Sequence, residues 1–265
     1  MCSEFKIFNA TEIWQRETSL PSVPTFSQTL DGVLGNGGIQ LGSIYEFLGL
    51  PGTGKTQICL QLCASVQIPK ELGGLNAEAI YIDTNTNFTK TRFKEILSAS
   101  LERCRKMLSD RKYDENAALK RLHYVKALGL ERFCSLIHML PDIISERPNV
   151  RLIVIDSITF PFKEGVTVKH RTGLLFRLIA EVQKLAMDKR IAVVLTNEMS
   201  TRIGLSTGSL VGAFGDAWAH RCNKRILLSA PEPLHKERLA ALIKSNNSPE
   251  TAGKFQITNG GIRDV

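Results

Sequence analysis

One short segment, residues 49–56, constrains this chain more than any other. It reads Gly-Leu-Pro-Gly-Thr-Gly-Lys-Thr and matches the phosphate-binding pattern G-x-x-x-x-G-K-[ST] at every fixed position. In that pattern the glycines let backbone N–H groups turn inward around phosphates, the lysine contacts the β- and γ-phosphates, and the hydroxyl binds Mg²⁺. The predicted ligands are Gly49, Leu50, Pro51, Gly52, Thr53, Gly54, Lys55 and Thr56.

The residues on either side of this segment support the same interpretation. Residues 43–48 read as a strand, and residues 57–66 read as a helix with Ile58, Leu62 and Val66 on one stripe. A helix that starts at the loop points the positive end of its dipole at a bound phosphate. A glycine-rich turn that matches by chance would lack this setting, so we predict that the chain binds ATP.

Apolar runs alternate with helical patterns along the rest of the chain. Continuous apolar runs predict strands that are covered on both faces. The predicted strands are 79–83, 122–125, 151–156 and 191–196, and the predicted helices are 88–108, 130–147 (interrupted near Pro141) and 174–187, with a loop at 112–118. Three short strands at 225–229, 239–244 and 254–258 indicate an antiparallel extension. The predicted fold is α/β, a mostly parallel twisted sheet flanked by helices, with this extension at the C-terminus.

A carboxylate at the end of a predicted strand supplies the second half of the site. Asp156 follows the apolar run Leu-Ile-Val-Ile about one hundred residues after the phosphate loop. In proteins of this kind a carboxylate at the tip of a neighbouring strand helps to hold Mg²⁺, with the hydroxyl of Thr56 as the other metal residue. The alternative is that Asp156 caps the start of a helix.

Composition limits the classes of protein that the chain could belong to. No apolar run approaches the ~18 residues that span a bilayer, and the six cysteines show no metal-ligand spacing. We therefore expect a reduced intracellular protein without structural zinc and without a membrane partner. The net charge of +8 permits nucleic-acid binding without proving it. Eight basic residues in 88–112 are interpreted as a solvated helix face, with a DNA-binding helix as the alternative.

Several motifs in a fixed order resemble the RecA/RadA recombinase family. After the phosphate loop come Tyr-Ile-Asp-Thr-Asn-Thr-Asn-Phe at 81–88, the apolar strand that ends in Asp156, and Val-Leu-Thr-Asn-Glu-Met at 194–199. The resemblance covers about residues 25–265 and is strongest to the eukaryotic Rad51 recombinase and its paralogues, the C-type paralogue in particular. It implies a RecA-like P-loop NTPase core at 25–265, preceded by a docking segment and linker at 1–24.

The resemblance implies roles for further residues. Arg92 would pack against the adenine. Residues 160–171 and 199–213 would be two DNA-facing loops that contact phosphates without reading sequence. Residues 9–17 could form a short helix, with an extended linker at 20–24, and the segment around Ala10 resembles the family's subunit-docking segment, with Ile7 at its aromatic position and Phe8 beside it. The implied DNA-contacting residues are Lys163, Lys169, His170, Arg171 and Arg202; solvated surface loops and a frayed N-terminus are the alternatives.

Asn85 departs from the family pattern. The family places its water-activating glutamate directly after Ile-Asp-Thr, whereas this chain has an amide there. An amide can orient a water molecule but cannot take its proton at neutral pH. General-base catalysis is typically worth ~10²–10⁴ in rate. We therefore expect ATP to bind normally and to be hydrolysed slowly.

Glu198 is the second departure. The family usually has a glutamine here that senses the γ-phosphate, and a carboxylate would repel that phosphate unless it is turned away or paired with a cation. Glu198 could instead serve as the missing base, which we consider the weaker interpretation. A third expected difference is that the chain lacks the small helical N-terminal domain of many relatives.

Three functions remain open on the sequence. The leading one is an ATP- and Mg²⁺-binding recombinase paralogue that acts in nuclear homologous recombination and double-strand break repair, mitotic or meiotic. It would act as a filament assembly factor or mediator on single-stranded or branched DNA, together with other paralogues or the main recombinase. The second is an active DNA-dependent ATPase with strand-exchange activity. The third is a nucleotide-locked protein scaffold that does not bind DNA.

Overall fold

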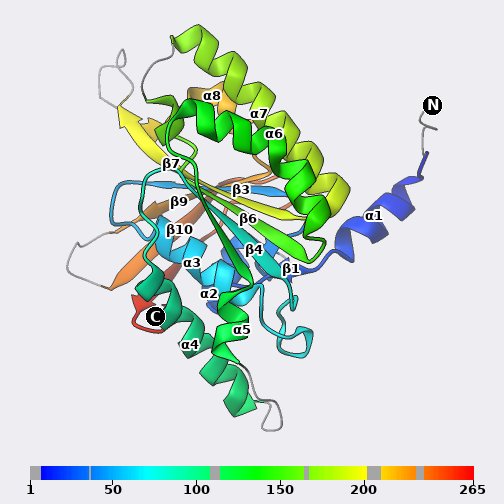
Figure 1. Cartoon of the computed structure of the whole chain (residues 1–265), viewed down its shortest axis with the longest axis vertical. Helices are drawn as coiled ribbons and strands as arrows, with labels where there is room; N and C mark the ends of the chain where they lie inside the picture. The colour runs from blue at the N-terminus through cyan, green and yellow to red at the C-terminus, as the bar shows by residue number, and fades with distance from the viewer. Residues whose placement is uncertain (1–6, 36, 108–113, 164–166, 202–209, 231–235) are drawn as a thin grey trace.

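A long twisted sheet organises the chain, and the figure shows it edge-on between two groups of helices (Figure 1). The computed structural model describes residues 7–35, 37–107, 114–163, 167–201, 210–230 and 236–265. The strands of the sheet are β3 (Ile44–Gly49), β4 (Glu78–Asp83), β5 (Leu122–Lys126), β6 (Val150–Asp156), β7 (Ala192–Thr201), β8 (Leu210–Gly212), β9 (Lys224–Ser229), β10 (Glu237–Lys244), β11 (Ala252–Thr258) and β12 (Gly261–Arg263).

The strand order within this part of the chain is β12-β11-β10-β9-β3-β7-β6-β4-β5, and β8 pairs with β7. The pairs from β9 to β5 are parallel, whereas β10, β11 and β12 join antiparallel. The predicted α/β fold with a C-terminal antiparallel extension is therefore confirmed. One detail differs: β9 is parallel to β3, so the extension begins at β10.

Helices cover both faces of the sheet (Figure 1). One face carries α2 (Gln28–Leu34), α3 (Lys55–Ser65), α4 (Lys90–Met107) and α5 (Glu115–Leu119). The other carries α6 (Leu130–Glu146), α7 (Val168–Lys189) and α8 (Gly215–Ala219). Successive strand residues point to opposite faces. Each face of the sheet therefore has its own hydrophobic core. Tyr81 on β4 and Val154 on β6 belong to the core under α2–α5, whereas their neighbours Ile82 and Ile153 belong to the core under α6–α8. This double burial explains the continuous apolar runs in the sequence.

Two local predictions were wrong. The stretch 112–118, predicted as a loop, contains the start of the short helix α5, which Asp114 caps by accepting a hydrogen bond from Asn116 N (2.9 Å). The helix predicted to break near Pro141 is one continuous helix, α6. Proline removes one backbone donor, but buried residues of α6 pack in the core both before Pro141 (Ile137) and after it (Ile144).

The N-terminal region has a helix and a short strand pair. Helix α1 (Ala10–Thr18) begins with a capping box, in which Asn9 Oδ1 accepts from Glu12 N (2.9 Å) and Glu12 Oε2 accepts from Asn9 N (3.0 Å). None of its residues is buried, and it projects from the body of the molecule (Figure 1). Strand β1 (Ser22–Val23) then pairs with β2 (Ile39–Gln40), which places part of the predicted linker 20–24 against the core.

Candidate nucleotide-binding site

The phosphate loop joins β3 to α3, the setting that the sequence predicted. Gly52 and Gly54 have φ values of 81° and 104°, a region that favours glycine. A Cβ atom at Gly49 would lie 2.5 Å from the carbonyl oxygen of Leu228, so only glycine fits there. A Cβ at Gly52 would meet nothing within 4 Å, so the space beside this residue is open. The loop therefore fits a phosphate group on geometric grounds.

Lys55 lies at the start of α3. Its Nζ donates hydrogen bonds to the carbonyl oxygens of Gly49 (2.7 Å) and Leu50 (3.0 Å). Burial lowers the pKa of Lys55, while the carboxylates of Glu198 and Asp156 oppose that shift. The hydrogen bonds thus hold the Lys55 ammonium group at the loop, near two carboxylates. A phosphate bound in the loop could pair with this positive charge.

Asp156 collects hydroxyl groups from three different elements. Its Oδ2 accepts from Thr56 Oγ1 (2.7 Å) and from Tyr81 OH (2.7 Å), and its Oδ1 accepts from Thr196 Oγ1. Burial raises the pKa of Tyr81 well above its usual value, with Asp156 adding to the shift. Carboxylate and hydroxyl oxygens are ligands that suit Mg²⁺. Asp156 and Thr56 therefore fit the metal role that the sequence assigned to them.

The position of Asp156 in the sheet differs from the expectation in one respect. Strand β7 lies between β3 and β6, so Asp156 is not on a strand adjacent to that of the phosphate loop. The carboxylate still reaches Thr56 because the carboxyl ends of parallel strands share one edge of the sheet. Beside it, Ser157 Oγ is buried and has no hydrogen-bond partner among the described residues, so the site retains an unsatisfied polar atom.

Asn85 is positioned by an aspartate that the sequence analysis did not single out. Asp83 is fully buried at the end of β4, and its Oδ1 accepts hydrogen bonds from the backbone N–H groups of Asn85 (3.0 Å) and Asn87 (3.3 Å). Its Oδ2 accepts from Phe88 N (3.2 Å) and Tyr124 OH (3.1 Å). In the sequence, the sign of this role was that Asp83 is an acidic residue at the end of an apolar strand. The partly buried Asn85 is therefore carried by a loop that Asp83 holds in shape.

Glu198 is paired with a cation. Its Oε2 lies 2.9 Å from Lys163 Nζ, and that ammonium group is also 3.7 Å from the centroid of the Phe160 ring. In the register of β3 and β7, Glu198 lies opposite Gly49, the first residue of the phosphate loop. Of the two arrangements that would relieve repulsion of the γ-phosphate, turning away or pairing with a cation, the structure shows the ion pair.

A buried network behind the site was missed by sequence reasoning. Glu46 on β3 is fully buried, and its carboxylate accepts from Asn197 Nδ2 (2.5 Å), from Trp218 Nε1 (2.6 Å) and from the guanidinium of Arg225. Asn197 Oδ1 in turn accepts from the hydroxyl of Thr159 (2.7 Å). The charged residue within the apolar run Ile-Tyr-Glu-Phe-Leu was the only sequence signal. The network ties β3, β7, α8 and β9 together beneath the phosphate loop.

Arg92, which we expected beside the adenine, lies at the start of α4. Its guanidinium donates to Gln57 Oε1 (2.8 Å) on α3 and to the carbonyl oxygens of Thr258 (2.6 Å) and Asn259 (2.7 Å). It therefore connects the phosphate-loop helix with the turn between β11 and β12. The N–H groups of the Arg92 guanidinium are engaged in these hydrogen bonds. Packing of Arg92 against the adenine stays a prediction.

The two segments expected to face DNA are partly regular structure. Phe160–Phe162 form a short 3-10 helix, and α7 begins at Val168, so Lys169, His170 and Arg171 lie in a helical turn rather than in a loop. Beside the start of α7, Thr167 Oγ1 contacts His170 Nδ1 (2.9 Å).

The second of these segments is also shorter than expected. Strand β7 continues to Thr201 and β8 covers Leu210–Gly212, while Arg202 lies outside the described residues. The Arg171 guanidinium lies 5.6 Å from the Phe214 ring centroid, which places the first segment beside the end of the second.

The expected docking residues lie around the start of α1. Ile7 is 92% exposed, and Ala10 is exposed as the first residue of the helix. Phe8 is partly covered by the guanidinium of Arg16, 3.9 Å above its ring. Trp14 on the same helix is also largely exposed. An apolar segment is therefore presented outside the core, and its docking role stays a prediction.

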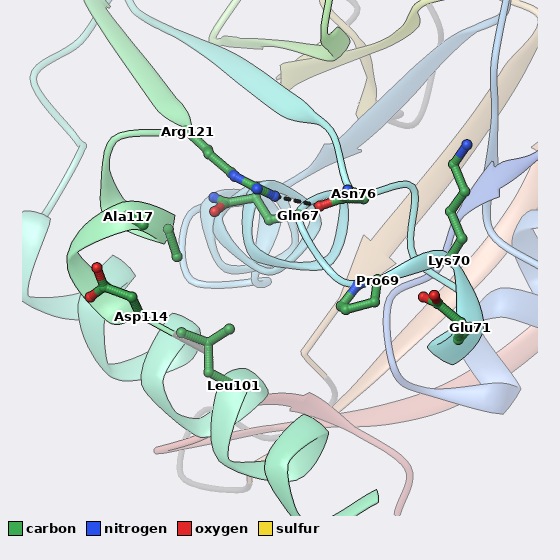
Figure 2. A pocket seen from close by; sticks show the side chains of 10 residues that line it. Gln67, Pro69, Lys70, Glu71, Asn76, Leu101, Asp114, Ala117 and Arg121 are labelled. Carbon is green, nitrogen blue, oxygen red and sulfur yellow. Dashed lines mark hydrogen bonds between the residues drawn. The ribbon is translucent and has the colours of Figure 1, made fainter. Parts of the chain in front are cut away.

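A separate cavity lies at the other end of α3 (Figure 2). Its volume is about 470 Å³, and Gln67, Leu101 and Arg121 are among the residues that line it. Gln67 Oε1 is buried there without a hydrogen-bond partner among the residues described. An 11-residue helix is about 16 Å long, so α3 separates this cavity from the phosphate loop. None of the predicted site residues lines it.

Two further observations concern metals and membranes. The described residues contain no group of three or more histidine, cysteine or acidic side chains arranged to hold a metal ion, and the five cysteines in this part of the chain are free. In the same residues, none of the helices combines the length and apolar character of a bilayer span.

The fold and the site together define a class of protein. A phosphate loop between β3 and α3, an aspartate on β6 beyond an intervening strand, and a largely parallel sheet are the features of a RecA-like P-loop core. Comparison with known proteins narrows this class: residues 15–265 match the family model described as Rad51. The chain belongs to the Rad51 family, which confirms the resemblance seen in its motifs.

Individual relatives agree with this assignment. The DNA repair protein RAD51 homolog 3 of Cricetulus griseus is 34% identical over 271 residues, covering 98% of this chain and 73% of that protein. The RAD51 homolog 3 of Dictyostelium discoideum is 32% identical, over 92% of this chain and 66% of that protein. The DNA repair and recombination protein RadA of Metallosphaera sedula is 32% identical, over 99% of this chain and 78% of that protein.

Proposed function

We propose that this chain is an ATP- and Mg²⁺-binding recombinase paralogue that acts in homologous recombination and DNA double-strand break repair. The observation that carries the proposal is the intact binding machinery around Lys55, Thr56 and Asp156, next to an amide at the position of the water-activating base. Such a site holds Mg-ATP and turns it over slowly. Bound nucleotide would then act mainly as a conformational ligand that orders loops and interfaces.

The proposed role is that of a filament assembly factor or mediator, working with other paralogues or with the main recombinase in the nucleus. The relatives named as DNA repair proteins support this. The core at 25–265 would bind nucleotide, and the segment 1–24 would dock onto a partner through Ile7, Phe8 and Ala10. Their exposure supports such a contact.

Single-stranded or branched DNA is the proposed nucleic-acid ligand. Lys163, Lys169, His170, Arg171 and Arg202 would contact its phosphates. Support comes from the net charge of +8 and from the proximity of Arg171 to Phe214, the residue that directly follows the second segment. Contacts of this kind release counterions, so the affinity should fall steeply as salt rises.

A paired measurement on the purified chain tests the proposal. Mg-ATP affinity is measured by titration, and ATP turnover is measured with and without single-stranded DNA. Tight binding with negligible turnover is expected. DNA-stimulated turnover at a rate normal for the family would instead support an active strand-exchange ATPase. ATP binding without salt-dependent DNA binding would favour the protein scaffold.

A further inference from the structure

Glu198 creates an electrostatic problem for a nucleoside triphosphate. It lies opposite Gly49 in the β3–β7 register, and its charge reaches Lys55, the residue that would contact the terminal phosphates. Two like charges repel more strongly near a protein surface than in bulk water, because the effective dielectric constant is lower there. A diphosphate lacks the γ-phosphate and would feel less of this repulsion. Unless it is neutralised, Glu198 should therefore select against ATP relative to ADP.

Lys163 is placed to supply that neutralising charge. Its Nζ is 2.9 Å from Glu198 Oε2 and lies 3.7 Å from the centroid of the Phe160 ring, which attracts cations. Both side chains are partly exposed, 45% for Lys163 and 31% for Glu198. An ion pair of that exposure adds little to folding stability. We therefore expect the pair to matter more for the charge that a bound nucleotide meets than for the stability of the fold.

The two partners are held together by their surroundings. Thr159, which precedes the short 3-10 helix, donates its hydroxyl proton to Asn197 Oδ1 (2.7 Å), and the same hydroxyl oxygen accepts from Glu198 N (3.3 Å). Within that helix, Phe162 is buried in the core. The end of β7 and the segment that carries Lys163 are thereby fixed relative to each other beside the phosphate loop.

We propose that Lys163 is a positioning residue of the nucleotide site, which neutralises Glu198 so that a nucleoside triphosphate binds beside it. This inference rests on the proposed ATP binding. It assigns to Lys163, in addition to a contact with DNA, control over the preference for triphosphate over diphosphate. The pair replaces the single neutral side chain that the family resemblance led us to expect at position 198.

A double-mutant cycle tests the inference by calorimetric titration with Mg-ATP and Mg-ADP. The proteins are the wild type, Lys163→Met, Glu198→Gln and the double variant. Lys163→Met should weaken Mg-ATP binding about tenfold and Mg-ADP binding much less, because it leaves one uncompensated charge near the γ-phosphate. Glu198→Gln should retain or strengthen Mg-ATP binding. The double variant should return to the wild-type preference, since no charge then needs a partner.

Control variants separate this effect from a general change in charge or folding. Lys184→Met removes one positive charge from the later part of α7, where Lys184 pairs with Asp188, and should leave both affinities unchanged. Lys163→Arg keeps the charge and should keep the preference for ATP. Thermal unfolding of each variant establishes that it is folded.

Three results would overturn the inference or its premise, and they can be told apart. Unchanged Mg-ATP affinity in Lys163→Met would show that Glu198 needs no neutralisation. A double variant as weak as Lys163→Met would mean that the lysine contacts the phosphate directly. A wild-type chain that binds no ATP would overturn the proposed function itself, and the inference with it.

Discussion

Thr56 and Asp156, one hundred positions apart in the sequence, are joined by a hydrogen bond of 2.7 Å at the mouth of the phosphate loop. Thr56 lies in the first turn of α3 and Asp156 ends β6, so the bond connects the phosphate-loop helix with a strand on the far side of β7. The Thr56 hydroxyl donates directly to the carboxylate. The same two oxygens would be the protein's ligands for a Mg²⁺ ion bound with the nucleotide.

Asp156→Asn should therefore weaken Mg-ATP binding by roughly tenfold or more, because a neutral amide is a poorer Mg²⁺ partner than a carboxylate. Binding of ATP without Mg²⁺ should change little or improve, since a negative charge near Lys55 is lost. Titrations with and without Mg²⁺ measure both effects. Asp188→Asn, which removes an exposed charge from α7, is the matched control. Equal losses in the two titrations would contradict the metal role.

Asn85→Glu should raise ATP turnover. A carboxylate at this position restores a general base, whose typical contribution is ~10²–10⁴ in rate. The backbone at position 85 is already held by Asp83, so the loop should keep its shape. Steady-state turnover is measured with single-stranded DNA present. Asn85→Gln lengthens the side chain without adding a base and should not raise the rate; an equal increase in both variants would rule out base catalysis.

Glu46→Gln should destabilise the fold. The substitution leaves the guanidinium of Arg225 without its anion and turns an amide group toward the donors of Asn197 and Trp218. Removing one partner of a buried ion pair typically costs about 3–5 kcal/mol in the free energy of unfolding. Urea denaturation measures this loss. Glu237→Gln, which affects an exposed pair with Lys254, should change stability by less than about 1 kcal/mol.

Asp31 should make stability depend on pH. It accepts hydrogen bonds from the backbone N–H and the hydroxyl of Thr25 (both 2.8 Å), yet burial raises its pKa from 3.8 to about 6. A raised folded-state pKa favours the protonated form, so this contribution is complete below pH 3.8 and is lost as the pH rises through about 6. One pKa unit is worth about 1.4 kcal/mol, so the loss is at most about 3 kcal/mol.

Asp31→Asn should remove this contribution, because an amide does not ionise and its oxygen can still accept from Thr25. The free energy of unfolding of the variant, measured by urea denaturation from pH 4 to 7, should vary less with pH than that of the wild type. The variant should also be the more stable of the two at pH 7. Parallel pH profiles for the two proteins would show that Asp31 is not the responsible group.

Much of the fold and the centre of the site could be predicted because their signals are local. The phosphate loop is a contiguous segment whose glycines and lysine have direct mechanical roles, and Asp156 ends an apolar run that only a buried strand explains. The helix at Pro141 was misjudged because a local rule about proline was outweighed by packing along α6. The start of α7 was placed too late because a helix that begins with polar residues lacks an apolar stripe.

The sequence by itself predicted the class of fold, the phosphate loop and the acidic end of the Asp156 strand, since each of these signals depends on neighbours along the chain. Only the tertiary structure decided that Lys163 faces Glu198, that Glu46 anchors Asn197, Trp218 and Arg225, and that Asp83 supports the loop of Asn85. These contacts depend on which strands adjoin and on how far each strand extends past the sheet edge. Strand order is set by the packing of the whole chain, so no single segment encodes it.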